Sequence, residues 1–312
     1  MHIHSNMHGN PAPSGGGMAS VLRAWTVASR PHTLTIGVIP VLVGCAMAWA
    51  ETGLIDVQLM LWSMLGALLL QTGTNLDNDV SDFQRGTDRA GRLGLPRATA
   101  LGLLTTQQVR TASRGCFVLA TLIGLVLAWR GGWPILVAGI ASAAAAMAYS
   151  GGPRPISYTP FGDIVVWFFF GMVAVGGSYY LQTLALSPGV LVAAAMVGLP
   201  ATAVLVVNNY RDLDPDRAVG KFTLAVWLGR GFTRWEYAGL VLAPFALLGV
   251  LAWQSRIGVT LAIPLLALPM AIGLARRFWR EVPGPAFNPL LAQTARFQVL
   301  FALLLCVGIL LR

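Results

Sequence analysis

Two short segments of the sequence contain seven of its twelve acidic residues, and all seven are aspartates. Asparagines stand beside both groups, and most members are spaced two, three or four residues apart. Side chains three or four residues apart share one face of a helix, so each segment is predicted to project two carboxylates and an amide oxygen from one stripe. The first cluster comprises Asn75, Asp77, Asn78, Asp79, Asp82 and Asp88, and the second comprises Asn208, Asn209, Asp212, Asp214 and Asp216.

Carboxylate and amide oxygens are ligands that suit Mg²⁺, an ion that shares its coordination shell with water and phosphate oxygens. Two clusters of this kind facing each other would hold a diphosphate between bound Mg²⁺ ions. We therefore expect a magnesium-dependent site for a diphosphate substrate. The predicted metal ligands are Asn75, Asn78, Asp79, Asp82, Asn208, Asp212 and Asp216, of which the four aspartates are the predicted catalytic residues.

Two other interpretations of the clusters stay open at this point. Mixed charges in a solvated loop are common, although two similar clusters, each at the end of an apolar helix, argue against this reading. A Ca²⁺ site is the second alternative, because the first cluster is as rich in aspartate as an EF-hand loop. That cluster lacks the glycine and the final glutamate that an EF-hand requires.

The composition indicates that these clusters belong to an all-α integral membrane protein. Of the 312 residues, 56% are hydrophobic and 11% are charged, and the mean hydropathy is +0.68. An average soluble domain contains about 25% charged residues, so a soluble enzyme and a disordered protein are excluded. Nine apolar segments, most of them long enough to span a bilayer as a helix, lie at residues 33–50, 57–75, 116–129, 133–149, 164–186, 190–208, 237–254, 258–275 and 297–311.

The distribution of Lys and Arg predicts the orientation of these nine transmembrane helices. With the N-terminus in the cytoplasm, 18 of the 21 basic residues fall in cytoplasmic segments, as the positive-inside rule requires. Each aspartate cluster then begins at the cytoplasmic end of an apolar helix. Residues 1–22, rich in His, Gly, Pro and Ser, are expected to form a disordered tail, followed by a single transmembrane domain over residues 23–312.

The two clusters resemble the paired aspartate-rich motifs of the UbiA superfamily of intramembrane aromatic prenyltransferases. They read Asn78-Asp79-x-x-Asp82 and Asn208-Asn209-x-Arg211-Asp212-x-x-x-Asp216. The resemblance covers roughly residues 24–311 and includes the stretches 149–158, 220–226 and 288–291. The Tyr-Ser-Gly-Gly-Pro-Arg-Pro stretch at 149–155 and the Asn-Asn-x-Arg-Asp pattern resemble the branch that makes menaquinone.

The resemblance implies a UbiA-type helical bundle and the transfer of a polyprenyl group from an allylic diphosphate. The implied acceptor is 1,4-dihydroxy-2-naphthoate, which loses carbon dioxide to give demethylmenaquinone. The implied location is the cytoplasmic (inner) membrane, with the active site facing the cytoplasm. The residues expected to bind the substrates are Arg30, Asp88, Arg97, Tyr149, Arg154, Arg211 and Lys221.

Two alternative functions stay open. A relative in the same superfamily would use another aromatic acceptor, such as 4-hydroxybenzoate or homogentisate. An anion transporter would place Asp and Arg in a gate, and it is expected to carry charges near the middle of its spans. The predicted spans have no such central charge, which favours an enzyme. A nucleic-acid partner is not expected, because cytoplasmic arginines account for most of the net charge of +9.

Overall fold

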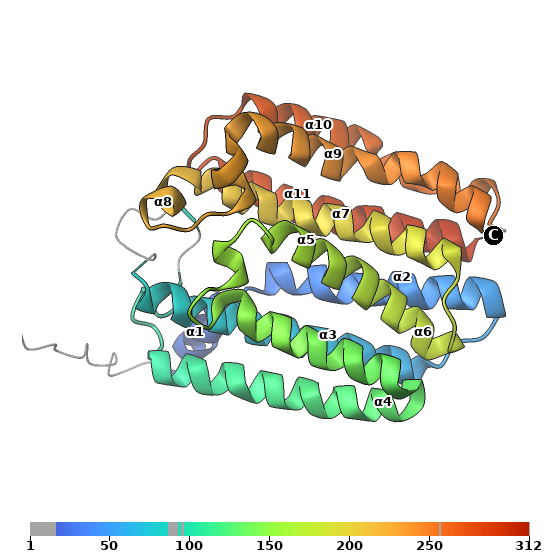
Figure 1. The fold of residues 1–312 in the computed structure, drawn as a ribbon, viewed down its shortest axis with the longest axis horizontal. Helices are drawn as coiled ribbons and strands as arrows, with labels where there is room; N and C mark the ends of the chain where they lie inside the picture. Colours follow the sequence, from blue (N-terminus) through green and yellow to red (C-terminus); the bar gives the residue numbers. More distant parts are fainter. Residues whose placement is uncertain (1–16, 87–92, 95–96, 256, 312) are drawn as a thin grey trace, which may run out of the picture.

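The computed structural model describes residues 17–86, 93–94, 97–255 and 257–311, and these residues form helices and connecting turns without a strand. The long helices lie side by side in a single bundle (Figure 1), which confirms the all-α class. The elements are α1 (Met18–Ser29), α2 (Pro31–Thr52), α3 (Val57–Gln84), α4 (Thr106–Ser150), η1 (Ile156–Tyr158), α5 (Gly162–Trp167), η2 (Phe168–Gly176), α6 (Gly177–Thr183), α7 (Pro188–Arg211), α8 (Leu213–Ala218), α9 (Leu224–Gln254), η3 (Val259–Ala267), α10 (Leu268–Arg280) and α11 (Phe287–Leu310).

Helix α7 lies at the centre of the bundle, because nearly all of its residues are small or apolar and most are buried. It packs closely against α5 and the π-helical segment η2. A Cβ atom at Gly198 would lie 2.7 Å from the carbonyl oxygen of Trp167, and one at Gly171 would lie 2.5 Å from that of Ala194. Glycine is therefore required at both contacts, and this close approach fixes the helix that leads into the second aspartate cluster.

Helix α4 reverses its direction at Gly132, whose φ of 69° favours glycine. A continuous helix of its 45 residues would be about 68 Å long. Arg110, near its start, nevertheless donates to the Gln84 side chain, and the carbonyl of its last residue, Ser150, accepts from Arg85. Both ends of α4 therefore lie at the same end of the bundle, and its two arms run antiparallel.

Eight helices in the described ranges are long and apolar enough to cross a membrane, judged by length and composition. One of them, α4, contains two of the nine predicted apolar segments. The continuous stretches α5–η2–α6 and η3–α10 correspond to two further segments. Nine membrane crossings and a cytoplasmic N-terminus stay predictions.

Helix boundaries near the two clusters differ from the predicted ones. Helix α3 continues to Gln84, so the first cluster is helical as far as Asp82. Helix α7 ends at Arg211, and Asp212, with φ −95° and ψ 9°, separates it from the short helix α8. The expectation that the second cluster projects from one stripe of a single helix is therefore not met, because the chain leaves α7 at Asp212.

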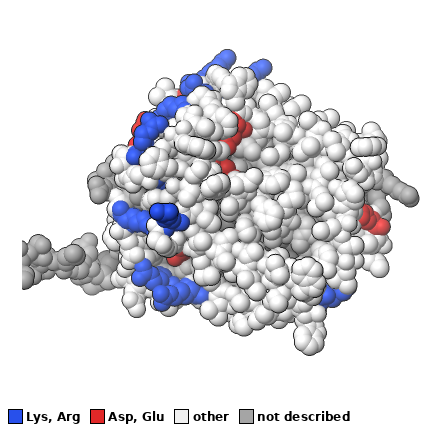
Figure 2. Space-filling view, in the orientation of Figure 1, with Lys and Arg blue, Asp and Glu red and all other residues white. Residues whose placement is uncertain are grey.

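The N-terminal part of the structure begins with α1 at Met18, upstream of the predicted boundary at residue 23. Residues 1–16 lie outside the described residues. Lys and Arg side chains gather mainly at the end of the bundle that carries α1 and α8 (Figures 1 and 2). This gathering matches the uneven distribution of basic residues along the sequence.

Candidate active site

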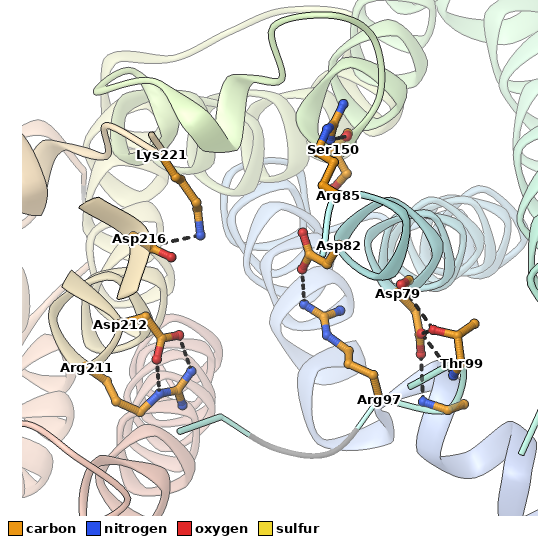
Figure 3. Close-up of polar contacts among 11 residues, drawn as sticks. Asp79, Asp82, Arg85, Arg97, Thr99, Ser150, Arg211, Asp212, Asp216 and Lys221 are labelled. Atoms are coloured by element: carbon orange, nitrogen blue, oxygen red, sulfur yellow. Dashed lines mark hydrogen bonds and ion pairs between the residues drawn. The ribbon is translucent and has the colours of Figure 1, made fainter. Parts of the chain in front are cut away.

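The two aspartate clusters come together at the end of the bundle where α3 and α7 terminate (Figure 3). Lys221 joins them electrostatically. Its Nζ lies 3.0 Å from Oδ2 of Asp216, and the carboxylates of Asp82 and Asp212 also act on it. Carboxylates from two segments that are far apart in the sequence therefore act on one ammonium group. Asp82 comes from the first cluster, and Asp212 and Asp216 come from the second.

In the second cluster, Asp212 is held by the guanidinium of the residue before it. Arg211 Nε and Nη2 donate to Oδ1 and Oδ2 of Asp212 at 2.8 and 2.6 Å. Arg211 Nη1 donates to Asn288 Oδ1 at 2.7 Å, and Asn288 Nδ2 donates to the carbonyl oxygen of Leu93 at 2.9 Å. The buried Arg211 thus connects the second cluster to the start of α11 and to the segment that follows the first cluster.

Asp216 and Lys221 are brought together by a turn in which the Lys221 N–H donates to the Asp216 carbonyl at 2.9 Å. Burial raises the pKa of the Asp216 carboxyl; Lys221 partly opposes this shift, and the nearby Asp212 and Asp82 add to it. Burial alone would lower the pKa of Lys221, but these carboxylates together raise it above its usual value. Lys221 is therefore a protonated cation at neutral pH.

The two central carboxylates of the first cluster have different partners. Asp82 forms an ion pair with Arg97. Asp79 is completely buried, and it accepts hydrogen bonds from the N–H groups of Ala98 and Thr99, at 3.0 and 3.2 Å, and from the Thr99 hydroxyl. The two side chains point to different sides of the end of α3 (Figure 3). The expectation that they act from one stripe is not met, because the turn beginning at Arg97 supplies Asp79 with its own donors.

The asparagines predicted as metal ligands also differ in their surroundings. Asn75 is buried, and its Nδ2 donates to the carbonyl oxygen of Ser29 and to Thr33 Oγ1, both at 2.9 Å. It therefore holds the junction between α1 and α2. Asn78 and Asn208 are half-buried beside the aspartates of their clusters.

The structure brings three of the expected substrate-binding cations into the site, each paired with an aspartate: Arg97, Arg211 and Lys221. Tyr149 lies at the end of α4, where it interacts electrostatically with Asp82. Arg154 is exposed in the loop before α5, and Arg30 occupies the α1–α2 junction with a φ of 52°. Asp88 lies outside the described residues.

Tyr158 also frames the site, and the sequence analysis did not single it out as a site residue. Arg85 donates to the carbonyl oxygens of Ser150 and Gly152, both at 2.6 Å, and its guanidinium lies 5.2 Å from the ring centroid of Tyr158. Lys221 Nζ lies 5.8 Å from the same centroid. The Tyr158 ring therefore lies between a cation of the first cluster's helix and a cation of the second cluster. An isolated tyrosine in a loop gives no sequence signal for this role.

Two further carboxylates, Asp163 and Glu236, were also missed by the sequence analysis. Each is a single acidic residue at the edge of an apolar segment, so neither forms a cluster that stands out. Asp163 is buried, Glu236 is half-buried, and the two interact electrostatically. An acidic residue inside or next to a membrane span is the signal that would have identified them.

The donor chemistry of the site fits Mg²⁺. Among the residues that the structure describes, no three or more His, Cys, Asp or Glu side chains are close enough together to hold one metal ion. Mg²⁺ does not need such a cage, since it usually binds one or two carboxylates together with water and substrate phosphates. Asp216 Oδ2 lies 3.0 Å from the Lys221 ammonium, which engages only one of the lone pairs of this oxygen. It therefore keeps lone pairs for another ligand.

The fold and the site together define an integral membrane protein with a charged site at one end of an apolar helical bundle. The sequence profile of the UbiA prenyltransferase family matches residues 37–292, and the chain belongs to this family. It is 36% identical over 295 residues to a 1,4-dihydroxy-2-naphthoate octaprenyltransferase of Escherichia coli (strain K12), with 93% of this chain and 96% of the relative covered. It is 35% identical over 281 residues to the protein of the same name from Mycobacterium tuberculosis (strain H37Rv), with 89% and 94% covered.

Solved structures agree with this family assignment at the level of the fold. A UbiA homologue from Archaeoglobus fulgidus, bound to DMAPP and Mg²⁺, matches with a TM-score of 0.61 at 16% sequence identity. The match covers 91% of this chain and 99% of that one. The predicted UbiA-type bundle is therefore confirmed.

Proposed function

We propose that this protein transfers a polyprenyl group from an allylic diphosphate to 1,4-dihydroxy-2-naphthoate, with loss of carbon dioxide, to give the quinol form of demethylmenaquinone. The observation that carries the proposal is the convergence of both aspartate clusters on Lys221 at one end of an apolar bundle. This arrangement puts the groups that bind a diphosphate next to an interior that suits a long hydrocarbon chain. The names of the two bacterial relatives support the naphthoate as acceptor.

The residues that we assign to metal binding are Asp82, Asp212 and Asp216, with Asn78 and Asn208 beside them. When bound there, Mg²⁺ neutralises the charge that develops on the diphosphate as its bond to the allylic carbon breaks. Asp79 already uses both carboxylate oxygens in hydrogen bonds to Ala98 and Thr99. Asn75 is fixed by its Nδ2, which donates to the α1–α2 junction, and its Oδ1 accepts from Gln71 at 3.4 Å. We therefore assign these two residues to positioning the first cluster, in place of the direct metal contact that the sequence predicts.

The cations of the site are assigned to the phosphate oxygens. Arg97, Arg211 and Lys221 each neutralise an aspartate in the structure, and each is a long side chain that reaches a new partner by rotating. Guanidinium groups match phosphate oxygens with two parallel hydrogen bonds. Arg154, exposed in the loop before α5, and Tyr149 are proposed to complete the contacts with the donor.

The chemical step needs no protein nucleophile. The allylic carbon, separating from its diphosphate, alkylates the electron-rich naphthoate ring, and the loss of carbon dioxide from the acceptor's carboxylate restores aromaticity. The buried apolar residues of α2 and α7 keep water away from the allylic cation, which water would otherwise trap. Arg30 is proposed as a contact for the carboxylate of the acceptor.

The proposed topology has nine membrane crossings, a cytoplasmic N-terminus and a site that faces the cytoplasm from the inner membrane. The gathering of Lys and Arg at the end of the bundle that holds the site supports this orientation (Figure 2). Reversal of α4 at Gly132 supports the number of crossings, because it lets one helix supply two of them.

A product assay tests the proposal. Purified protein in detergent is mixed with Mg²⁺, a long allylic diphosphate and 1,4-dihydroxy-2-naphthoate, with and without EDTA, and the products are identified by mass spectrometry. We expect a prenylated, decarboxylated naphthoquinol that disappears with EDTA. Product formed only with 4-hydroxybenzoate or homogentisate would overturn the acceptor assignment. Folded protein that forms no product with any acceptor would overturn the enzymatic assignment and favour a transporter.

A further inference from the structure

A second polar region lies beside the candidate site, where the two apolar stretches that begin with α5 and α9 meet α7. It contains the carboxylates of Asp163, at the start of α5, and of Glu236, within α9. Asp163 is only 6% exposed, Glu236 is half-buried, and the two interact electrostatically. Neither residue has a role in the function proposed above.

Over the part of the chain that the structure describes, these two carboxylates have no cation beside them, unlike Asp82, Asp212 and Asp216. Asp82, Asp212 and Asp216 each have a Lys or Arg partner. Among the described residues, no Lys or Arg nitrogen lies within 4.0 Å, the limit for an ion pair, of a carboxylate oxygen of Asp163 or Glu236. Burying a carboxylate without a cation is costly, and a like charge nearby increases the cost. A carboxylate retained under these conditions inside a membrane protein indicates a function.

The groups around Asp163 supply few hydrogen-bond donors. The only side-chain donor recorded for it among the described residues is Asn209 Nδ2, which lies 3.5 Å from Asp163 Oδ1, the limit of a hydrogen bond. The apolar Leu205 side chain lies close to Gly162, next to Asp163. Asp163 therefore has spare capacity to accept a hydrogen bond, in surroundings that favour an uncharged donor over a solvated cation.

Asp163 lies near residues of both aspartate clusters. The charges of Asp163 and Asp82 both act on the phenol of Tyr149, so this phenol lies near Asp163 and near the first cluster. Asn209, the partner of Asp163, directly follows Asn208 of the second cluster. A flat molecule held at Asp163 would therefore lie close to Asn209 and Tyr149, next to the two aspartate clusters.

We propose that Asp163 accepts a hydrogen bond from a ring hydroxyl of the aromatic acceptor and, with Glu236 nearby, selects acceptors that carry such hydroxyls. This inference rests on the proposed function, because it names the part of the protein that recognises the second substrate. A phenolic hydroxyl donates a hydrogen bond without bringing a charge into the apolar region. The carboxylate of a hydroxynaphthoate must point away from Asp163, since like charges repel.

The test measures binding of the acceptor alone. The fluorescence of 1,4-dihydroxy-2-naphthoate is titrated with wild-type protein and with Asp163→Asn, without donor, and KM is then measured separately for both substrates. We expect the Kd and KM for this acceptor to rise about 10- to 100-fold, as for the loss of a hydrogen bond to a charged group. The KM for the allylic diphosphate is expected to stay unchanged.

A matched control is Glu51→Gln, because Glu51 accepts hydrogen bonds from Tyr179 and Ser187 and lies outside both substrate sites. We expect it to bind the acceptor like the wild type. Analogues that lack one ring hydroxyl sharpen the assignment: for the analogue without the contacting hydroxyl, the wild type and Asp163→Asn should bind equally. The melting temperature of each variant in detergent separates misfolding from a specific loss of binding.

The outcomes distinguish this inference from the proposed function. If wild-type protein makes the prenylated product and Asp163→Asn binds the acceptor with unchanged Kd, the inference is wrong and the function stands. If Asp163→Asn raises the KM values of both substrates equally, Asp163 has only a structural role and the inference is again wrong. If the folded wild type binds the donor but not 1,4-dihydroxy-2-naphthoate, the proposed acceptor itself is wrong.

Discussion

The two aspartate clusters contain the same residue types at similar spacing, but the fold holds them in different ways. In the first, Asp79 accepts hydrogen bonds from two backbone N–H groups and a hydroxyl of one turn. In the second, Asp212 and Asp216 are paired with the side chains of Arg211 and Lys221. A side-chain cation can rotate away, whereas backbone donors leave only if the turn unfolds. Part of the first cluster therefore stabilises the fold, whereas the carboxylates of the second cluster can exchange their partners for a ligand.

Within the first cluster, Asp79 stabilises the fold, whereas Asp82 is available for ligand binding. Asp82 is 17% exposed and pairs with Arg97, whereas Asp79, one turn earlier, is 0% exposed. Asp82 therefore resembles the second cluster in its partner and its access to the site. The site is better described as Asp82, Asp212 and Asp216 around Lys221 than as two equivalent motifs.

The largest expected effect separates carboxylates within the second cluster. Asp216→Ala and Asp212→Ala should lower kcat at least about 100-fold, because each removes charge that stabilises the leaving group. Asp214→Ala should change it less than about twofold, since Asp214 is 70% exposed and its ion pair with Arg230 is at the surface. The measurement is the rate of prenylated product, with gel filtration in detergent to check folding. An equal decrease in kcat in all three variants would mean that Asp212 and Asp216 have no special role compared with the exposed Asp214.

The next effect tests the structural use of Asp79. The sequence alone predicts that Asp79→Ala abolishes activity while membrane insertion stays intact. The structure adds that Asp79→Asn should lower the free energy of unfolding by about 1–3 kcal/mol, since a buried acceptor of several hydrogen bonds loses its charge. Thermal unfolding in detergent measures this loss. In a double-mutant cycle with Thr99→Val, we expect a coupling of about 1 kcal/mol.

The contrary result for Asp79 would also be informative. If Asp79→Asn unfolds at the wild-type temperature and yet has no activity, Asp79 acts like Asp212. The two clusters would then be equivalent in function. The contacts of Asp79 with the turn that starts at Arg97 would have to be exchanged for a ligand during the reaction.

A smaller effect is expected where the two clusters are joined. Asn288→Ala removes the amide that accepts from Arg211 and donates to the Leu93 carbonyl. Loss of such a supporting contact typically costs about tenfold, so we expect a tenfold rise in the KM for the allylic diphosphate. Gln293→Ala is the control on the same helix, since Gln293 contacts Arg277 and not the site. An identical KM in Asn288→Ala would mean that Arg211 is placed by Asp212 alone.

The smallest effect concerns the Tyr158 ring, which Arg85 and Lys221 approach from the two clusters. Tyr158→Leu should lower the free energy of unfolding by roughly 0.5–1 kcal/mol, because it removes partly exposed cation–π contacts. Tyr158→Phe keeps the ring and should lose less. Thermal unfolding of both variants measures the difference, and equal losses would assign the effect to the hydroxyl group.

Spacing in the sequence was sufficient to predict the class of fold and to single out carboxylates that the fold brings together at one end of the bundle. Apolar segments of membrane length predict the helices, and clustered aspartates predict Asp82, Asp212 and Asp216. These features are local, because they depend on composition and on helical periodicity. Even the reversal at Gly132 was anticipated as a gap between two apolar segments, since glycine and proline interrupt the pattern there.

The rest depended on tertiary contacts. Periodicity puts Asp79 and Asp82 on nearby faces, but the donors of Ala98 and Thr99 decide which way Asp79 points. The break at Asp212 arises where the chain leaves α7. Its sequence signal is Pro215 in the first turn of α8, which has no N–H to donate to the Arg211 carbonyl. Asp163 belongs to no cluster, and its only sequence signal is its place at the edge of an apolar segment; its burial is known only from the structure.

The contact between Arg211 and Asn288 also sets an order of events during synthesis. The chain is made from its N-terminus, so Arg211 emerges well before Asn288, which begins the last helix. Until α11 is inserted, the guanidinium beside the second cluster lacks this partner, and so does the Leu93 carbonyl. A nascent protein therefore carries both aspartate clusters in the membrane before the link between them exists, and the site is completed only when the final helix arrives.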